Sequence, residues 1–318
     1  MINKNTALKQ DDIRQIRKCF YQGKVMTKKD VRETTGISYG GITNILQELL
    51  VEKEILYVSD ADSTGGRRSK QYVLNPDYAH IGTVNCHRHD NLYFFDTCGY
   101  AVNGEKCYSH CSVLKDGTFA QLKRETGRLM RADSLISVLV INIPGFCEEG
   151  VVRLCDFHNF EGIHIQEELG LNIPVVIEND VNTACIGLYH EEKHENMALI
   201  YQPSAEYSGA GLILHGRLYN GSNHRAGEMR YLYGEEPAGN LNKPVEQLRK
   251  EISAIQAVLD PEVIGWHSDL VEEKELLKYM EGSEAHLKQI SDLNALIETG
   301  MYAIGKDDLM NHGKGENI

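Results

Sequence analysis

The chain has 318 residues, of which 42% are hydrophobic and 25% are charged. That length allows two or three domains with cores of their own and excludes a small module held together by disulfides. No apolar run approaches the roughly 20 residues that a membrane-spanning helix needs. The first ten residues are polar and lack the apolar region of a secretory signal, so we expect a cytoplasmic protein.

Charge is distributed unevenly along the chain. Residues 1–80 contain 13 lysines and arginines against 10 aspartates and glutamates, whereas residues 81–318 contain 20 against 36. A basic N-terminal segment in front of an acidic remainder is typical of a nucleic-acid-binding module joined to a part that does not touch nucleic acid. We therefore expect one domain at residues 1–80 and another at residues 81–318.

Eight cysteines are scattered over the chain, and we expect them to be reduced because a chain of this size does not need disulfides. One group contains residue types that bind metals: Cys86, His87, His89, Cys107, His110 and Cys111. It lacks the close pairs of a zinc site, and in an alternating strand Cys107 and Cys111 would lie on the face opposite His110. We expect buried thiols and no metal.

The N-terminal segment has the pattern of a helix-turn-helix. A first helix is predicted at residues 8–21 from the helical spacing of its apolar residues. Thr27 stands at a helix N-cap with Asp30 three residues later, and Ser38 caps a third helix. The apolar face of that third helix is Ile42, Ile45, Leu46, Leu49 and Leu50. Residues 35–37 join the two short helices into the motif.

The second helix of such a motif lies in the major groove of DNA, with its N-terminal residues at the base edges. In this chain those residues are Ser38, Tyr39, Gly40, Thr43, Asn44 and Gln47. Serine, threonine, asparagine and glutamine side chains can bind bases or phosphates, and glycines allow close backbone approach. The same residues also suit a solvated helix surface, so the helices alone leave both interpretations open.

A predicted hairpin after these helices favours DNA binding. Residues 55–59 and 69–74 read as strands, and residues 60–66 form a polar turn. Two glycines near its tip are followed by Arg67 and Arg68, whose guanidinium groups suit phosphate contact or insertion into a narrow minor groove. Helices and hairpin together predict a winged helix-turn-helix.

Beyond residue 76 the pattern changes to strands alternating with helices, which indicates an α/β fold. We expect strands at residues 84–95, 101–114, 135–143 and 174–177, and helices at residues 119–131 and 161–169. The polar triplet Glu178, Asn179 and Asp180 follows a buried strand. The carboxyl ends of such strands are where α/β proteins place ligand-binding groups.

Five motifs, in order along the chain, resemble those of the ROK family, named for repressors, open reading frames and kinases. They lie at residues 63–68, 143–145, 177–184, 209–228 and 259–264. With the winged helix in front, the chain is similar to the regulator branch of xylose and N-acetylglucosamine repressors. The resemblance implies a two-lobed, actin-like (ribonuclease H-like) sugar-kinase fold. Lobe 1 would span about residues 81–190 with a C-terminal helix at about 293–318, and lobe 2 about 191–292.

The resemblance also implies an effector site. Residues that match Asn179 and Asp180 hold sugar hydroxyls in the family, and the aspartate is the base of the kinases. Glu228 matches a further sugar-binding carboxylate, and Glu246 matches another more loosely. This chemistry is sound, because an amide both donates and accepts while carboxylates accept from neighbouring hydroxyls.

Other positions depart from the family's kinases. Their phosphate loop, Asp-x-Gly-Gly-Thr, presents backbone amides to ATP, but residues 83–88 contain neither aspartate nor glycine. The family's zinc-binding cysteines are absent from residues 231–246, and its Gly-Gly-Gly loop reads Gly-Trp-His-Ser at residues 265–268. Since a kinase supplies mainly phosphate positioning and charge stabilisation, we expect no kinase activity and no cofactor.

Arg230 replaces the family's histidine after the Gly-Glu pair. Its guanidinium would either neutralise Glu228 or recognise a phosphate or carboxylate on the effector. A different interpretation places Asp180, Glu228 and Arg230 in an internal ion-pair network without a ligand.

The predicted function is a dimeric or tetrameric regulator, a repressor of carbohydrate genes, that binds operator DNA and a sugar or sugar-phosphate effector. Two alternatives stay open. One is an ATP-dependent ROK sugar kinase, and the other is a regulator controlled by a protein partner, with a vestigial pocket.

Overall fold

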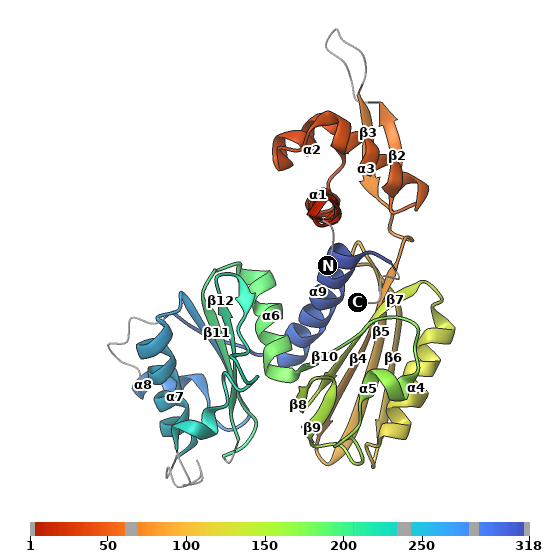
Figure 1. The fold of residues 1–318 in the computed structure, drawn as a ribbon. Coiled ribbons are helices and arrows are strands. Elements are labelled where there is room, and N and C mark those ends of the chain that lie inside the picture. The colour runs from red at the N-terminus through yellow and green to blue at the C-terminus, as the bar shows by residue number, and fades with distance from the viewer. Residues whose placement is uncertain (1–3, 61–68, 206, 234–242, 280–285, 315–318) are drawn as a thin grey trace.

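The structure is a computed structural model that describes residues 4–60, 69–205, 207–233, 243–279 and 286–314. Figure 1 shows a small part, which we call the head (residues 4–74), beside a larger body that begins at residue 80. The body has two five-stranded β-sheets, with helices between them and on their outer faces, and a small two-stranded sheet. Among the described helices, none has the length and apolar character needed to span a membrane.

The head has the element order of a winged helix. It contains α1 (Lys4–Tyr21), β1 (Met26–Thr27), α2 (Lys28–Thr35), α3 (Tyr39–Val51), β2 (Ile55–Asp60) and β3 (Lys70–Leu74). The strands form one antiparallel sheet in the order β1-β3-β2. Ile16, Phe20, Val31, Ile42 and Leu46 are buried among these elements. The tip of the hairpin, with Arg67 and Arg68, lies outside the described residues.

The caps predicted for the two short helices are confirmed. The hydroxyl of Thr27 accepts from the backbone N–H of Asp30, whose carboxylate accepts from the backbone N–H of Thr27 at 2.7 Å. The Ser38 hydroxyl accepts from the N–H of Gly41. Side-chain acceptors therefore satisfy helix-end donors at the start of both α2 and α3, which fixes the turn between them.

The first sheet of the body has the order β10-β7-β4-β5-β6. Its strands are β4 (His80–His89), β5 (Leu92–Ala101), β6 (Lys106–Leu114), β7 (Ile136–Ile143) and β10 (Val175–Asn179). The prediction of one strand at 84–95 and one at 101–114 is wrong, because these segments belong to three strands. The chain reverses at Asp90 and Asn91, whose φ angles of 49° and 60° are those of a tight hairpin turn.

Two helices and a small hairpin cover the outer face of the first sheet. They are α4 (Phe119–Ala132), α5 (Ile165–Leu169) and the pair β8 (Gly145–Glu148) with β9 (Val151–Cys155). The helix predicted at 161–169 is shorter than expected. Gly162 has φ of 79°, and the ring of His164 caps the first turn, so the helix begins only at Ile165.

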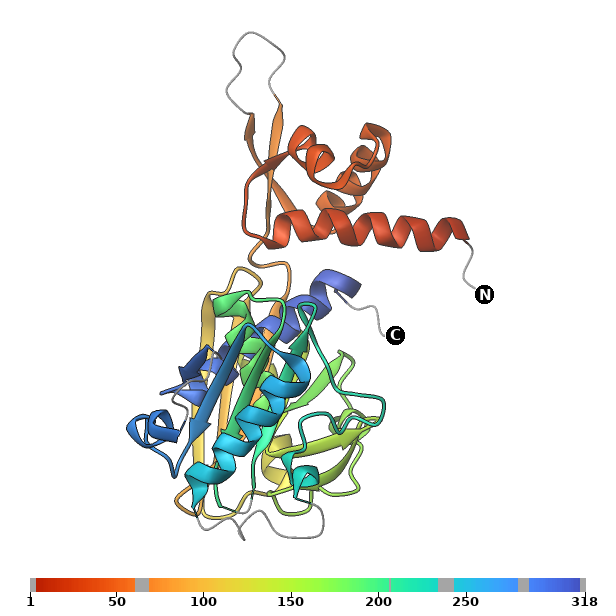
Figure 2. The same ribbon diagram turned by 90° about the vertical axis from the view of Figure 1, so that its left-hand side faces the viewer.

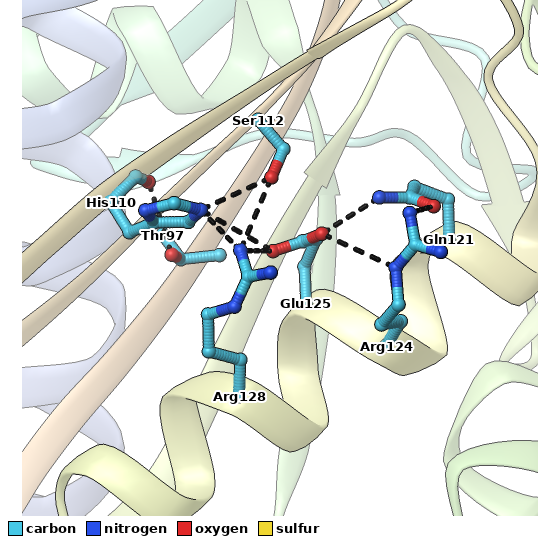
Figure 3. A network of polar contacts seen from close by, with 7 residues as sticks. All are labelled: Thr97, His110, Ser112, Gln121, Arg124, Glu125 and Arg128. Carbon is cyan, nitrogen blue, oxygen red and sulfur yellow. Dashed lines mark hydrogen bonds and ion pairs between the residues drawn. The ribbon is translucent and has the colours of Figure 1, made fainter.

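Figure 3 shows the polar network that fastens α4 to the sheet. The carboxylate of Glu125, whose side chain is 1% exposed, accepts from Gln121 at 2.7 Å and from Arg128 at 2.6 Å. Arg128 also contacts the ring of His110 and the hydroxyl of Ser112 on β6. The buried charge is thereby both paired and hydrogen-bonded, as burial of a carboxylate requires.

The second sheet has the order β13-β12-β11-β14-β15. Its strands are β11 (Met197–Gln202), β12 (Gly209–Leu214), β13 (Arg217–Leu218), β14 (Val263–Ser268) and β15 (Leu287–Gln289). A short 3-10 helix, η1 (Met229–Leu232), follows β13 in the chain, and α7 (Pro244–Leu259) and α8 (Glu273–Tyr279) lie on the outer face of the sheet.

Helices α6 (Asp180–Glu192) and α9 (Leu293–His312) form the layer between the two sheets (Figure 1). They cross with their backbones in contact. A Cβ atom at Gly300 would lie 1.9 Å from the carbonyl oxygen of Thr183, and one at Gly187 would lie 2.0 Å from that of Leu296. Only glycine allows so close an approach at these two positions.

The far end of α9 reaches the head, where α1 lies along the side that faces the body (Figure 2). Arg17 of α1 packs against Gly313 and forms a buried ion pair with Glu54 at 2.9 Å. The hydroxyl of Tyr78 accepts from the backbone N–H of Lys314. One helix therefore contacts both the DNA-binding module that the sequence predicts and the interior of the body.

The cysteines are free thiols. Cys86 and Cys98 are buried as expected, but Cys107 and Cys111 are exposed, because β6 is the edge strand of its sheet. Within the described ranges, no three histidine, cysteine or acidic side chains are grouped closely enough to hold a metal ion.

Candidate effector cavity and DNA-facing helix

A cavity of about 380 Å³ opens at the carboxyl end of β10. Its walls come from β8, β10 and the start of α6 on one side, and from the segment between β13 and η1 on the other. The polar side chains that line it are Glu178, Asn179, Asn182, Asn220, His224 and Glu228. The cavity thus lies between the first sheet and the second. It is next to the polar triplet at residues 178–180, where the sequence predicted ligand-binding groups.

Two asparagines at the start of α6 organise this cavity. Asn179 caps the helix, and its side-chain oxygen accepts from the N–H of Asn182 at 2.7 Å. The amide nitrogen of Asn182 donates to Glu178 at 2.9 Å and to Asn220 at 3.3 Å, so it links the two walls. Asn179 also lines the cavity, and its side-chain oxygen is the atom that caps the helix.

Glu178 lines the cavity and belongs to the polar triplet expected near a ligand, but it was not among the five effector residues predicted from the family motifs. Its carboxylate accepts from its neighbour's backbone N–H at 3.0 Å and from Asn182. Burial raises the pKa of Glu178, while these hydrogen bonds and the nearby His224 act in the opposite direction. Only its place at the strand end pointed to a role, because the family motif gives sugar contacts to the two residues that follow.

Asp180 lies beside the cavity and is not among the residues that line it. Its carboxylate accepts from the backbone N–H of Val181 at 2.8 Å. Burial raises the pKa of Asp180 to about 6, and the negative charge of Asp156 adds to the shift. The carboxyl is therefore poorly solvated, and its charge changes close to neutral pH.

Glu228 lines the cavity and pairs with Arg230, whose Nε lies 3.4 Å from a carboxylate oxygen. The Arg230 side chain is 58% exposed, lies over the ring of Tyr231 and is not part of the lining. Glu246 stands in the first turn of α7 and does not line the cavity either. The structure thus brings together Asn179 and Glu228 of the five effector residues predicted from sequence.

The start of α3 presents a mixture of free and engaged side chains. Tyr39 is 46% exposed, with the guanidinium of Arg32 4.5 Å from its ring centre. The hydroxyl of Thr43 donates to the Tyr39 carbonyl at 2.7 Å and accepts from Lys28 at 3.0 Å. Asn44 and Gln47 are exposed, as are Ser38 and Gly40. The side-chain amides of Asn44 and Gln47 are therefore both open to solvent.

The segments that match the phosphate loops of the kinases are strands in this chain. Residues 83–88 lie within β4, paired with β5 on one side and, up to Asn85, with β7 on the other. Residues 265–268, expected at a loop position, lie within β14, and Trp266 is buried. The backbone amides of these segments that face a neighbouring strand are engaged in sheet hydrogen bonds.

The body has the two-lobed, actin-like fold that the sequence predicts, and the head has the element order of a winged helix. No family model matches the sequence. The chain is 26% identical to the xylose repressor of Staphylococcus xylosus over 275 residues, which cover 80% of this chain and 69% of that protein. It is 22% identical to the xylose repressor of Bacillus subtilis over 302 residues, 90% of this chain and 75% of the relative.

Solved structures share the fold. A ROK family transcriptional regulator, a homologue of the Escherichia coli MLC protein, superposes with a TM-score of 0.71 at 15% identity, over 95% of this chain and 98% of its own. The ROK hexokinase of Thermus thermophilus superposes with a TM-score of 0.53 at 15% identity, over 70% of this chain and 97% of its own. The xylose repressors and the first of these two structures confirm the predicted likeness to ROK-family regulators of the xylose repressor branch.

Proposed function

We propose that this protein is a DNA-binding repressor whose affinity for its operator is controlled by a sugar bound in the cavity at the end of β10. The observation that carries the proposal is the connection of that cavity to a winged-helix head through α6 and α9. Similar proteins are named xylose repressors, which supports the same kind of regulation here.

The DNA-binding half rests on α3 and the wing. Six residues at the exposed start of α3 would face the major groove: Ser38, Tyr39, Gly40, Thr43, Asn44 and Gln47. Because the hydroxyl of Thr43 is already engaged twice, Asn44 and Gln47 are the better candidates for reading bases. Arg67 and Arg68 would contact phosphates or the minor groove. A symmetric dimer or tetramer would place two such heads on a palindromic operator.

The effector half rests on the chemistry and position of the cavity. Its volume lies within the range of small-ligand sites, and amides and carboxylates surround it. Asn179 and Glu228 would bind sugar hydroxyls directly, whereas Asp180, Arg230 and Glu246 would act from its edge or after closure of the walls. A ligand that bridges the walls would favour one angle between them, and it shifts the equilibrium by its differential affinity for the two arrangements.

We further propose that the chain is not a kinase. Phosphoryl transfer needs backbone amides and charges around the transferred group, and the matching segments here are strands β4 and β14. Asp180 would then bind ligand rather than act as a base.

The kinase alternative keeps one observation in its favour, since a carboxyl with a pKa of about 6 suits a general base. ATP turnover in the presence of sugars, lost in Asp180→Asn, would establish that alternative. Absence of ATP binding in calorimetry would remove it.

The proposal is tested by selecting DNA sequences that bind the full-length protein from a random pool, then measuring affinity with and without sugars. We expect enriched sequences with two-fold symmetry and a change in affinity when a sugar is added. Gln47→Ala should weaken specific binding about tenfold or more, the loss of one good base contact. Gln15→Ala, which changes the same residue type on α1 rather than on α3, is the matched control. No enriched sequence would refute DNA recognition.

A regulator controlled by a protein partner would instead bind its operator with the same affinity whether or not sugars are present. Glu228→Ala would then leave regulation intact.

A further inference from the structure

The cavity at the end of β10 has an unbalanced set of charges. Two carboxylates line it, those of Glu178 and Glu228, whereas no lysine or arginine does so within the described part of the chain. His224 is the one lining side chain there that can carry positive charge. A site built for an anion normally offers guanidinium or ammonium groups, or helix N-termini.

The arginine that suggested an anionic effector lies elsewhere. The Arg230 side chain is more than half exposed. It lies over the ring of Tyr231 and forms an ion pair with Glu228. It therefore reduces the negative charge of Glu228 from outside the cavity. It does not present a free cation to a ligand inside.

Glu178 has no lysine or arginine partner among the described residues, and His224 is the nearby group that can partly offset its charge. Its hydrogen-bond partners among the described residues are a backbone N–H and the amide of Asn182, which are neutral. The carboxylate is largely withdrawn from water, so its field within the cavity is screened less than that of a surface carboxylate. An anionic substituent in the same cavity would meet this field directly.

The N-terminus of α6 does not offset this charge for a ligand. The side chain of Asn179 already accepts from the N–H of Asn182, and Asp180 accepts from that of Val181. These acceptors occupy the donors through which a helix start usually binds anions.

We infer that the cavity selects uncharged sugars over phosphorylated or acidic ones, and that Glu178 is the residue that determines this specificity. The inference rests on the proposed effector role of the same cavity. Carboxylates and amides suit the hydroxyls of a neutral sugar, which donate as well as accept. Phe146 in the lining offers an apolar surface for the carbon face of the ring.

The test is isothermal titration of the full-length protein with pairs of sugars that differ in charge. The probes are glucose and glucose 6-phosphate, and glucuronamide and glucuronate, the last pair being almost equal in size. We expect the neutral member of each bound pair to bind at least tenfold more tightly. Tighter binding of the anionic members would overturn the inference and leave sugar regulation intact.

The role of Glu178 is tested by Glu178→Gln, which keeps the shape and removes the charge. We expect the ratio of the dissociation constants of glucuronate and glucuronamide to fall several-fold, because glucuronate binds more tightly. Glu148→Gln is the control, because that carboxylate stands on β8 near the cavity, does not line it and pairs with Arg153. An unchanged ratio in Glu178→Gln, or an equal fall in Glu148→Gln, would refute the assignment to Glu178.

Two further outcomes are distinguishable from these. If no sugar of either charge binds, the effector role fails and the inference fails with it, while selection of DNA sequences still tests the head separately. If Glu178→Gln does not fold, the glucuronamide and glucuronate pair on the unaltered protein still decides the charge preference.

Discussion

A methyl group at Gly300 should disturb the crossing of α6 and α9. The Cβ atom of Gly300→Ala would lie 1.9 Å from the Thr183 carbonyl oxygen, whereas ordinary contact begins near 3.4 Å, so the helices must separate by more than 1 Å. Overpacking of this kind costs about 1–3 kcal/mol. Alanine recovers up to about 1 kcal/mol through its higher helix propensity. We therefore expect the free energy of unfolding to fall by up to about 2 kcal/mol once that recovery is subtracted.

The same substitution should weaken communication between cavity and head. Thr183 lies one turn after Asn179, which lines the cavity, and α9 continues from this crossing to Arg17 in the head. Urea unfolding measures the stability, and titration of operator affinity with sugar measures the coupling. We expect the sugar-dependent change in affinity to shrink in Gly300→Ala while affinity for DNA without sugar is retained.

The control for this experiment is Gly127→Ala on α4. There a Cβ atom would meet only the end of the Arg131 side chain at 3.3 Å, so the helix should become as stable as before or more so. If Gly300→Ala unfolds at the same urea concentration as Gly127→Ala and responds equally to sugar, the two helices do not transmit the signal through this contact.

Two further substitutions test buried charges. Glu54→Gln should lower the free energy of unfolding by about 3 kcal/mol, because it leaves the Arg17 guanidinium buried without its partner; Glu48→Gln, in an exposed pair, should cost under about 1 kcal/mol by urea unfolding. The pKa of Asp180 is about 6 in the folded protein and about 3.9 in an unfolded chain. Asp180→Asn should therefore stabilise the protein by up to about 3 kcal/mol at pH 7.5 and have little effect at pH 4. Stability is then lost as pH rises from about 4 to 6, and equal effects at both pH values would contradict the shift.

Local signals were sufficient to predict the head. Thr27 and Ser38 predicted where α2 and α3 begin, because an N-cap depends on one side chain and the next three residues. The hairpin at Asp90 and Asn91 was missed because it contains no glycine, although both residues tolerate a left-handed backbone. Turns of this kind are decided by the pairing of the flanking strands, which a sequence window does not show.

The cavity was only partly predictable. Asn179 and Glu228 came from motifs, but Asn220 and His224 enter the lining because the second sheet brings their segment against β10. The position of Arg230 outside the lining also depends on how the 3-10 helix η1 turns after Glu228. Such placements follow from long-range packing, which neighbours in sequence do not determine.

Helix α9 is made after every other helix that the structure describes, yet it lies in the centre of the body and against β4, whose residues are translated some two hundred positions earlier. During synthesis, the head can complete its core long before the layer between the two sheets exists, since domains generally fold as units in N-terminal order. At that stage α3 is complete, whereas α9, which packs against both α6 and α1, is not yet made. Under the proposed function, synthesis of α9 would be the step that couples the cavity to the head.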